Sequence, residues 1–185
     1  MYREYLGRNM RLAVIVNPDA GLGGRLGFKG SDGRAAEARA AGAQDRAGPR
    51  MRQCLEKLAE LAREPIEIIA WDGRMGGDWI PGEYTSTGVT PETTDASSTS
   101  DFIKAHSPDL FLYAGGDGTT RDIVEALGER NIPLVGVPGG VKMHSGCFAT
   151  TPKAAAEVVW SFVTGDLMVA RTEVMDLDEE VYRKG

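Results

Sequence analysis

The sequence predicts an α/β fold, an open and mostly parallel sheet flanked by helices. Short apolar runs of strand length alternate along the chain with longer stretches whose apolar residues recur at helical spacing. Three of the runs lead directly into glycine-rich loops, as strands do at the ligand-binding edge of such a sheet. The four clearest runs cover residues 11–16, 66–71, 110–114 and 131–138.

The chain has the composition of a soluble globular domain. Its 185 residues suffice for one well-buried domain, and 42% of them are hydrophobic and 26% charged. The net charge of −6 argues against a nucleic-acid partner, which requires a basic surface. With only Cys54 and Cys147, no disulfide framework is expected, which favours a cytoplasmic protein. The apolar run 12–16 is too short for a secretion signal or a membrane span.

The first half of the chain reads as strand, helix and strand. Residues 11–16 have the length and character of a buried strand. The Ala- and Arg-rich stretch 34–44 is compatible with a short helix, and residues 51–63 predict a longer one because their leucines and alanines share one face. Pro65 ends this helix, and the β-branched run 66–71 is the second strand.

The segment 72–100 is predicted to be a long loop. Gly and Asp are frequent in its first part, and Thr and Ser dominate its second part. A helix follows up to Ala105, with Ser98 or Ser100 as its N-cap, and Pro108 stops it.

The alternation of strands and helices continues to the end of the chain. Residues 120–127 are compatible with a helix that Gly128 ends. Residues 152–164 predict a further helix, with Pro152 near its first position. Residues 167–175 have the pattern of a last strand.

The third apolar run leads into Gly-Gly-Asp-Gly-Thr-Thr, the most informative stretch of the chain. A strand, a glycine turn and a helix in this order present main-chain N–H groups and a helix N-terminus to a phosphate. Glycines let a ligand approach the main chain, and two threonine hydroxyls stand where the N-cap is expected. By itself the motif could also be an ordinary strand-to-helix turn. The residues concerned are Gly115, Gly116, Gly118, Thr119 and Thr120.

Asp117 is the unexpected member of this motif, because a carboxylate repels phosphate. Its presence is explained if it binds Mg²⁺ or accepts the proton of a hydroxyl that attacks a phosphoryl group. Asp122, in the first turn of the following helix, could hold Mg²⁺ or an arginine, or could be a favourable charge at a helix N-terminus. No Gly-x-x-x-x-Gly-Lys-Ser/Thr sequence is present, so the chain is not a P-loop NTPase.

Two further glycine loops follow the first and the last apolar runs. The first carries an arginine that could contact phosphate, and an ordinary surface loop is the alternative. The last carries a lysine and a histidine that could neutralise phosphate charge, and the alternatives are a solvated lysine and a loop-stabilising histidine. If the strands are parallel, all three loops meet at one sheet edge, as a nucleoside triphosphate requires. The candidates are Asn17, Gly21, Gly23, Gly24 and Arg25 in the first loop, and Gly139, Gly140, Lys142 and His144 in the last.

These motifs, in this order, resemble the ATP-NAD kinase-like family of the NAD kinase and diacylglycerol kinase superfamily, and most closely its branch that includes acetoin-catabolism protein X. The resemblance covers most of residues 11–150. It rests on Asn17-Pro18-Asp19-Ala20-Gly21-Leu22-Gly23-Gly24-Arg25, Lys29-Gly30-Ser31-Asp32-Gly33, Gly115-Gly116-Asp117-Gly118-Thr119-Thr120-Arg121-Asp122 and Pro138-Gly139-Gly140-Val141-Lys142-Met143-His144-Ser145.

The resemblance implies an N-terminal α/β domain followed by an all-β domain, with the active site between them. It implies ATP or polyphosphate as the donor, used with Mg²⁺. It also implies that Asp117 lies at the reacting centre and aids attack of the NAD 2′-hydroxyl on the γ-phosphate, as in NADP biosynthesis. Chains of the family are longer, so residues 1–170 are expected to form the α/β kinase domain and residues 171–185 the start of a truncated second domain. The isolated fragment can therefore be inactive.

The expected function is that of an ATP-dependent small-molecule kinase of the NAD kinase type, with Asp117 as the catalytic residue. A diacylglycerol-type lipid kinase is one alternative, although no basic amphipathic helix suits a membrane surface. A non-catalytic nucleotide-binding module is the other. The expected partner is a small-molecule hydroxyl acceptor, with neither nucleic acid nor membrane. Self-association through the face left by the missing domain stays open, as do the identities of acceptor and donor.

Overall fold

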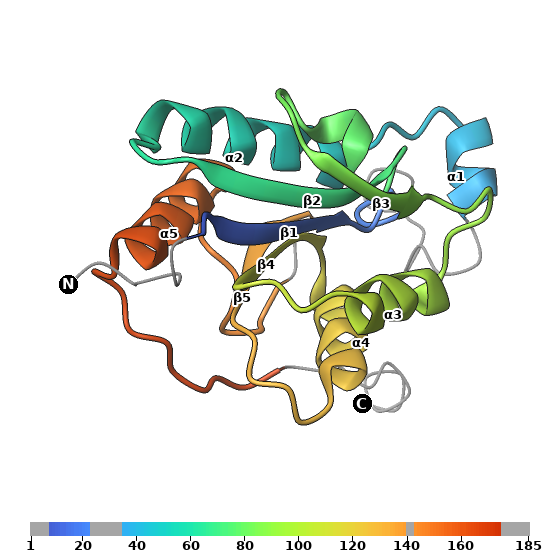
Figure 1. Ribbon diagram of the computed structural model, residues 1–185. Coiled ribbons are helices and arrows are strands. Elements are labelled where there is room, and N and C mark those ends of the chain that lie inside the picture. The colour runs from blue at the N-terminus through green and yellow to red at the C-terminus, as the bar shows by residue number, and fades with distance from the viewer. Residues whose placement is uncertain (1–7, 23–34, 140–142, 175–185) are drawn as a thin grey trace.

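The computed structural model describes residues 8–22, 35–139 and 143–174. Its centre is a sheet of five parallel strands in the order β3-β2-β1-β4-β5 (Figure 1). The predicted open parallel sheet of an α/β fold is therefore confirmed. The strands are β1 (Met10–Val16), β2 (Ile66–Asp72), β3 (Thr85–Val89), β4 (Leu110–Gly115) and β5 (Leu134–Pro138).

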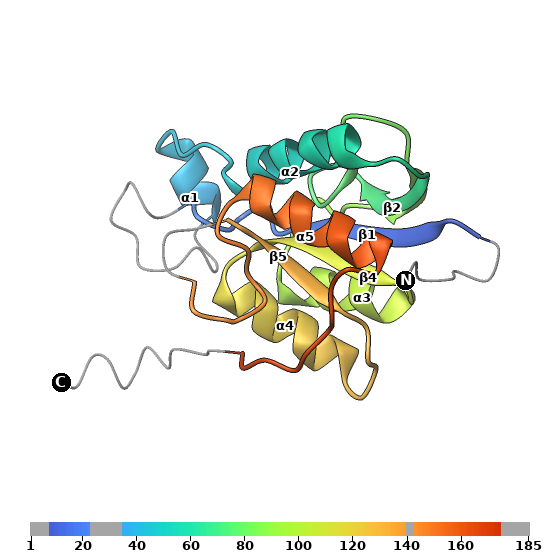
Figure 2. The same ribbon diagram turned by 90° about the vertical axis from the view of Figure 1, so that its left-hand side faces the viewer.

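Helices cover both faces of this sheet. On one face α2 packs against α5, and on the other face α3 packs against α4, as the two views of Figures 1 and 2 show. In the described part of the chain, no helix combines the length and the apolar character needed to cross a membrane. The helices are α1 (Ala35–Ala40), α2 (Ala47–Leu61), α3 (Ala96–Ala105), α4 (Asp117–Leu127) and α5 (Pro152–Thr164), with a 3₁₀ turn η1 (Gly77–Trp79).

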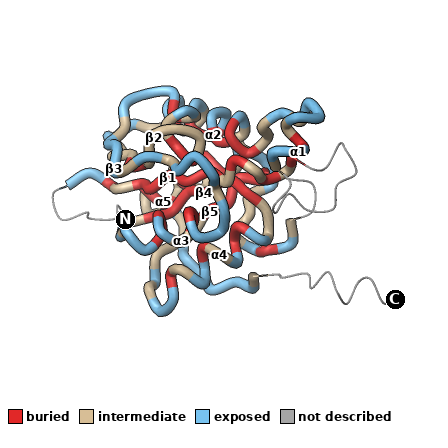
Figure 3. Tube along the Cα trace, turned by 90° about the vertical axis from the view of Figure 1, so that its right-hand side faces the viewer, coloured by how far each residue is buried: buried red, intermediate tan, exposed pale blue. Residues whose placement is uncertain are grey.

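The central strands β1 and β4 are buried on both faces of the sheet (Figure 3). Successive side chains of a strand point to opposite faces. Leu12 and Val14 therefore pack in the layer under α2 and α5, whereas Ala13 and Ile15 pack in the layer under α3 and α4. This double burial explains why the sequence shows uninterrupted apolar runs here rather than an alternating pattern.

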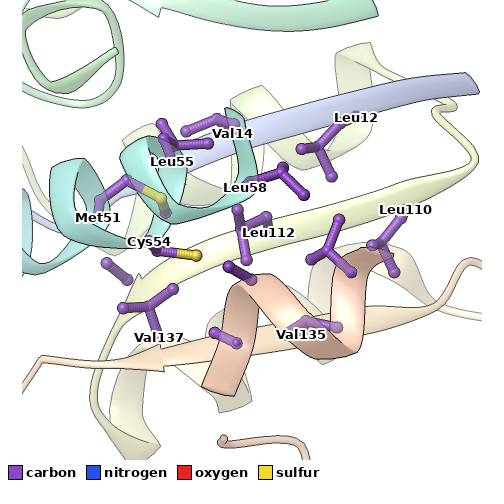
Figure 4. Packing of buried hydrophobic residues seen from close by; sticks show 14 of the residues in the cluster. Leu12, Val14, Met51, Cys54, Leu55, Leu58, Leu110, Leu112, Val135 and Val137 are labelled. Atoms are coloured by element: carbon purple, nitrogen blue, oxygen red, sulfur yellow. The ribbon is translucent and has the colours of Figure 1, made fainter. Parts of the chain in front are cut away.

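Helix α2 turns its apolar face toward the sheet. Met51, Cys54 and Leu58 lie on the side of α2 that faces the strands, close to Leu112 and Val137 (Figure 4). Cys54 is fully buried, and this burial raises the pKa of its thiol to about 12. Cys54 is therefore a core residue.

The strand order creates a switch point between β1 and β4. From β1 the chain crosses through α2 to β2 on one side, whereas β4 leads through α4 to β5 on the other side. Neighbouring strands whose connections leave in opposite directions open a crevice at their carboxyl ends, which is where open α/β sheets bind ligands. The loops that start at Asn17 and Gly116 flank this crevice.

The segment 72–100, predicted to be a loop, contains strand β3, which was not predicted from the sequence. β3 pairs in parallel with β2 at the sheet edge, with Thr85 opposite Ile69 and Ser86 opposite Ala70. Most of its residues are exposed and polar, so they show no apolar pattern. The strand forms because its main chain completes the hydrogen bonds of β2.

Three helices, α2, α3 and α4, begin earlier than predicted, and α4 begins at Asp117 rather than at residue 120. α2 begins at Ala47 rather than near residue 51, and α3 begins at Ala96. The N-cap of α3 is Asp95, not Ser98 or Ser100, because its carboxylate accepts hydrogen bonds from the main-chain N–H groups of Ser97 and Ser98. Ser98 instead completes a capping box as the third helical residue.

The last helix matches its prediction, whereas the predicted last strand is wrong. α5 covers 152–164, with Thr151 capping its first turn. Residues 167–174 have no regular structure, and Met168 is 93% exposed. The outer edge of β5 is already occupied, because Gly136 hydrogen-bonds the main chain of the segment 147–149. The apolar run after α5 therefore has no sheet edge to join there.

Candidate active site

The three glycine loops meet at the carboxyl ends of β1, β4 and β5. The N–H of Asn17 donates to the carbonyl oxygen of Ala114, and the N–H of Gly139 donates to that of Gly115, both at 2.9 Å. A Cβ on Gly139 would lie 2.9 Å from the Gly115 oxygen, and a Cβ on Gly21 would collide with the Gly139 oxygen. Glycine is required here because main-chain segments approach too closely for side chains.

Asn17 links the first loop to the second. Its side-chain amide donates to the Thr119 hydroxyl at 2.9 Å, and its Oδ1 accepts the main-chain N–H of Asp19 at 3.0 Å. Both ends of the amide group are therefore used within the protein. Asn17 therefore ties the loop after β1 to the start of α4.

The two threonines after Asp117 are buried. α4 begins at Asp117 with Gly116 as its N-cap, so the predicted N-cap role of Thr119 and Thr120 is wrong. Gly116 has the extended conformation of an N-cap, and Thr120 hydrogen-bonds the Tyr113 hydroxyl and the Gly116 carbonyl instead. The first N–H groups of α4 have no acceptors within the helix, which is the arrangement that binds phosphate.

Asp117, the first residue of α4, is bound by the third loop. Its Oδ1 accepts the hydroxyl of Ser145 at 2.7 Å and the main-chain N–H of Ser145 at 2.9 Å. The main-chain N–H of His144 lies 3.1 Å from Oδ1 and 2.9 Å from Oδ2. The carboxylate therefore joins the loop after β4 to the loop after β5.

Hydrogen bonding lowers the pKa of the Asp117 carboxyl. Partial burial acts to raise its pKa, but the hydrogen bonds from Ser145 and His144 favour the charged form and hold the pKa below its ordinary value. The N-terminus of α4 also favours a negative charge at this position. The site thus presents an anion that can accept a hydrogen bond or a proton.

The third loop contacts Asp117 through its main chain and through the Ser145 hydroxyl. His144 is exposed, and the group that contacts Asp117 is its N–H rather than its imidazole. Ser145 is buried and was not among the predicted site residues. The Tyr113 hydroxyl hydrogen-bonds Cys147 Sγ at 3.0 Å and so supports the same loop from β4.

The other predicted site residues either have open space beside them or lie outside the described part of the chain. Gly116 and Gly118 would have no neighbouring atom within 4 Å of an added Cβ, so a ligand can approach their main chain. Five further predicted residues lie outside the part of the chain that the structure describes. They are Gly23, Gly24, Arg25, Gly140 and Lys142.

Comparison with known proteins identifies the family of this chain. The family described as ATP-NAD kinase N-terminal domain matches residues 12–167. The chain belongs to this family. A NAD kinase from Cytophaga hutchinsonii is 36% identical over 78 residues, which are 40% of this chain and 26% of that protein.

Two solved structures from Bacillus anthracis str. Sterne are more remote. A putative diacylglycerol kinase aligns with a TM-score of 0.45 and 17% identity over 83% of this chain and 41% of that one. A second diacylglycerol kinase aligns with a TM-score of 0.36 and 18% identity over 71% of this chain and 33% of that one. In each of these comparisons the chain spans less than half the length of its relative.

In this ATP-NAD kinase domain, Asp122 lies in a cleft between α3 and α4. It pairs with Arg121 at 3.1 Å, and the cleft of about 250 Å³ is also lined by Lys104 and Glu125. Among residues 8–22, 35–139 and 143–174, no three His, Cys, Asp or Glu side chains gather to hold a metal ion. The predicted metal role of Asp122 therefore gains no support from its surroundings.

Two arginines of the ATP-NAD kinase domain, not predicted from the sequence, reach the loops from the N-cap position and the first turns of α2. Arg50 Nη1 donates to the carbonyl oxygen of Pro138, at the end of β5, at 2.7 Å. The stem of Arg46 passes Gly21, with its Cδ 3.3 Å from the position of a Cβ there. Both were missed because the helix was expected to begin near residue 51. The available signal was topological, since a helix that crosses between parallel strands begins at their carboxyl edge.

A network of partly buried ion pairs braces the first loop of the domain. Arg39 contacts Asp19 at 2.7 Å and Asp45 at 3.2 Å, and Arg74 contacts Asp45 at 2.7 Å. The Thr94 hydroxyl donates to Asp19 Oδ2 at 3.0 Å. Burial acts to lower the pKa of Arg39, but its two carboxylate partners raise that pKa above its ordinary value. The loop after β1 is thus fixed to α1 and to the loop before α3.

Proposed function

We propose that this chain is the nucleotide-binding domain of an ATP-dependent phosphotransferase that phosphorylates a small-molecule hydroxyl, with the 2′-hydroxyl of NAD as the first candidate. The observation that carries the proposal is the ionised carboxylate of Asp117 where three glycine loops meet. Membership of the ATP-NAD kinase family and the NAD kinase relative support this choice. Residues 1–170 would form this domain and residues 171–185 would lead into a second one, in a cytoplasmic protein.

The donor phosphates would bind at the carboxyl edge of the sheet. The N–H groups at the start of α4, which have no acceptor within the helix, would donate to phosphate oxygens, and the glycine loops would let these oxygens reach the main chain. Arg46, the N-cap residue of α2, and Arg50, within α2, bring positive charge to the same edge. Inorganic polyphosphate presents the same oxygens, so it is the alternative donor.

Asp117 would orient the attacking hydroxyl. As the new oxygen–phosphorus bond forms, the bond between the γ-phosphorus and the bridging oxygen breaks, ADP leaves and the hydroxyl proton passes to the carboxylate. In a loose transition state this proton moves late, so a carboxylate with a lowered pKa suffices. The main contribution of Asp117 is then alignment and charge rather than strong basicity.

Mg²⁺ would enter with the donor as the magnesium–nucleotide complex. Mg²⁺ is ordinarily held by substrate phosphates and water with few protein ligands, so the donor can carry it to an edge that offers main-chain N–H groups. When bound, the ion neutralises charge on the phosphate oxygens. In this arrangement Asp122 is not a ligand of the ion, and it pairs with Arg121 instead.

The test is phosphoryl transfer by the full-length gene product. Terminally labelled ATP with Mg²⁺ would be incubated with NAD, with nucleosides and with diacylglycerol, alongside the Asp117→Asn variant. Label on NAD that falls by on the order of 10²- to 10⁴-fold in the variant, with ATP binding retained, supports the proposal. Label on diacylglycerol alone would move the acceptor class to lipids. ATP binding without transfer to any acceptor would instead indicate a non-catalytic nucleotide-binding module.

A further inference from the structure

The two oxygens of Asp117 receive hydrogen bonds unequally. Oδ1 accepts the hydroxyl of Ser145 at 2.7 Å, the N–H of Ser145 at 2.9 Å and a share of the His144 N–H at 3.1 Å. Among the contacts of the described residues, Oδ2 accepts the other share of the His144 N–H, at 2.9 Å. A carboxylate offers about four lone-pair sites. Oδ1 is therefore saturated, and Oδ2 has room for another donor.

We infer that Ser145 is a positioning residue, which fixes Asp117 through Oδ1 so that Oδ2 is the oxygen presented to the attacking hydroxyl. This inference rests on the proposed function. Ser145 supplies two donors to one oxygen, one from its main chain and one from its side chain, so it restrains the rotation of the carboxylate as well as its position. The reacting oxygen is then defined before any substrate binds.

The loop that carries Ser145 is anchored independently of its hydroxyl. On one side, the N–H of Gly136 in β5 donates to the carbonyl oxygen of Cys147 at 2.9 Å. On the other side, the N–H of Gly146 donates to the carbonyl oxygen of Glu173 at 3.2 Å. Removal of the hydroxyl therefore leaves the loop tied down and takes a single donor from the catalytic carboxylate.

Burial strengthens the effect of the hydrogen bond from the Ser145 hydroxyl to Asp117. Ser145 is 4% exposed, so water does not readily replace its hydroxyl when the side chain is shortened to alanine. The acceptor is charged, and hydrogen bonds to charged groups are about twice as strong as those between neutral groups. In Ser145→Ala the remaining donors restrain the rotation of the Asp117 carboxylate less tightly. Its productive alignment with the attacking substrate hydroxyl therefore becomes less frequent.

The experiment compares Ser145→Ala and Ser145→Thr with the matched control Ser98→Ala in the full-length protein. Ser98 is 5% exposed and its hydroxyl also contacts an aspartate, Asp95, at 3.4 Å, but at the start of α3. Ser145→Ala is expected to lower kcat by on the order of 10- to 100-fold with KM for ATP unchanged. Ser145→Thr keeps the hydroxyl and is expected to restore most of kcat, and Ser98→Ala is expected to match the wild type.

A second readout does not depend on activity. The carboxyl ¹³C resonance of Asp117, assigned with Asp117→Asn, is expected to titrate at higher pH in Ser145→Ala, because a donor to the charged form has been removed. A titration that does not move overturns the inference, whether or not kcat falls. If the wild-type protein transfers phosphate to no acceptor while the titration still moves, the positioning of Asp117 by Ser145 stands and the proposed function is the part overturned.

Discussion

The charged side chains within the described parts of the three glycine loops are negative. Within the described part of the three loops, residues 17–22, 116–119, 139 and 143–146, the acidic side chains are those of Asp19 and Asp117, and no lysine or arginine is present. A polyphosphate needs compensating cations in addition to main-chain N–H groups. Arg46, at the N-cap of α2, and Arg50, within α2, are described residues that bring such charge to the same edge.

Replacement of either arginine by glutamine is expected to weaken ATP binding by on the order of tenfold, because each variant loses one charge-assisted contact with phosphate. The affinity for adenosine is expected to stay unchanged, since adenosine carries no phosphate. Isothermal titration of the full-length protein with both ligands measures the difference. Arg52→Gln is the matched control, because Arg52 lies on the same helix and donates to a carbonyl oxygen, that of Asp78, at 2.9 Å. Equal losses for ATP and adenosine in Arg46→Gln or Arg50→Gln would contradict the assignment.

Asp109 joins strands β1 and β4 at the amino-terminal edge of the sheet. Its carboxylate accepts two hydrogen bonds from the guanidinium of Arg8, at 2.7 and 2.9 Å, and one from the N–H of Arg11 at 2.7 Å. Partial burial acts to raise the pKa of Asp109, but these donors hold that pKa below its ordinary value of 3.8. The start of β1 is thus tied to the start of β4, opposite the proposed active site.

Asp109→Asn is expected to lower the free energy of unfolding at neutral pH by about 1–2 kcal/mol, because a charge-assisted pair is lost. The pKa of Asp109 is lower in the folded state than in the unfolded state. The stabilisation is therefore complete above the unfolded value and disappears as the pH falls through the folded value. Urea titrations between about pH 5 and pH 2 are expected to show the difference between variant and wild type shrinking. A difference that is independent of pH would exclude this pair as the cause. Glu67→Gln is the control, since its pair with Arg11 is long, at 3.4 Å, and its side chain is 40% exposed.

Folding of the whole molecule buries one of its two thiols, that of Cys54, in the core layer between the sheet and helices α2 and α5. Cys54 is fully buried with a pKa of about 12, whereas Cys147 is partly exposed. Alkylation requires both access and the thiolate form. The reactivity of Cys54 is therefore controlled by opening of the core.

In the Cys147→Ser variant at about pH 8, alkylation of Cys54 is expected to be at least about a thousandfold slower in buffer than in denaturing urea, since an intact domain rarely opens. Alkylation followed by mass spectrometry gives both rates. The Cys54→Ala variant, which retains the partly exposed Cys147, is expected to react faster in buffer. If Cys54 reacts in buffer nearly as fast as in urea, the α2 layer is not packed as described.

The sequence by itself determined the strands β1, β2, β4 and β5 and the helix α5. Double burial makes a central strand a continuous apolar run, and Pro152 and Gly165 fix the two ends of α5 through local backbone chemistry. It also predicted that three glycine loops share one edge, because parallel strands place all their carboxyl ends together. These features depend on neighbouring residues or on one rule of topology.

The tertiary structure alone decided which groups meet at that edge. Asp117 and Ser145 are 28 positions apart, and no local pattern marks the hydroxyl that binds the carboxylate. His144 contacts Asp117 through its main-chain N–H, and a main-chain group has no signature in the sequence. β3 likewise forms because β2 offers it hydrogen bonds, not because its own residues are apolar. Contacts of this kind are fixed by packing between distant segments, so they are found only once the chain is folded.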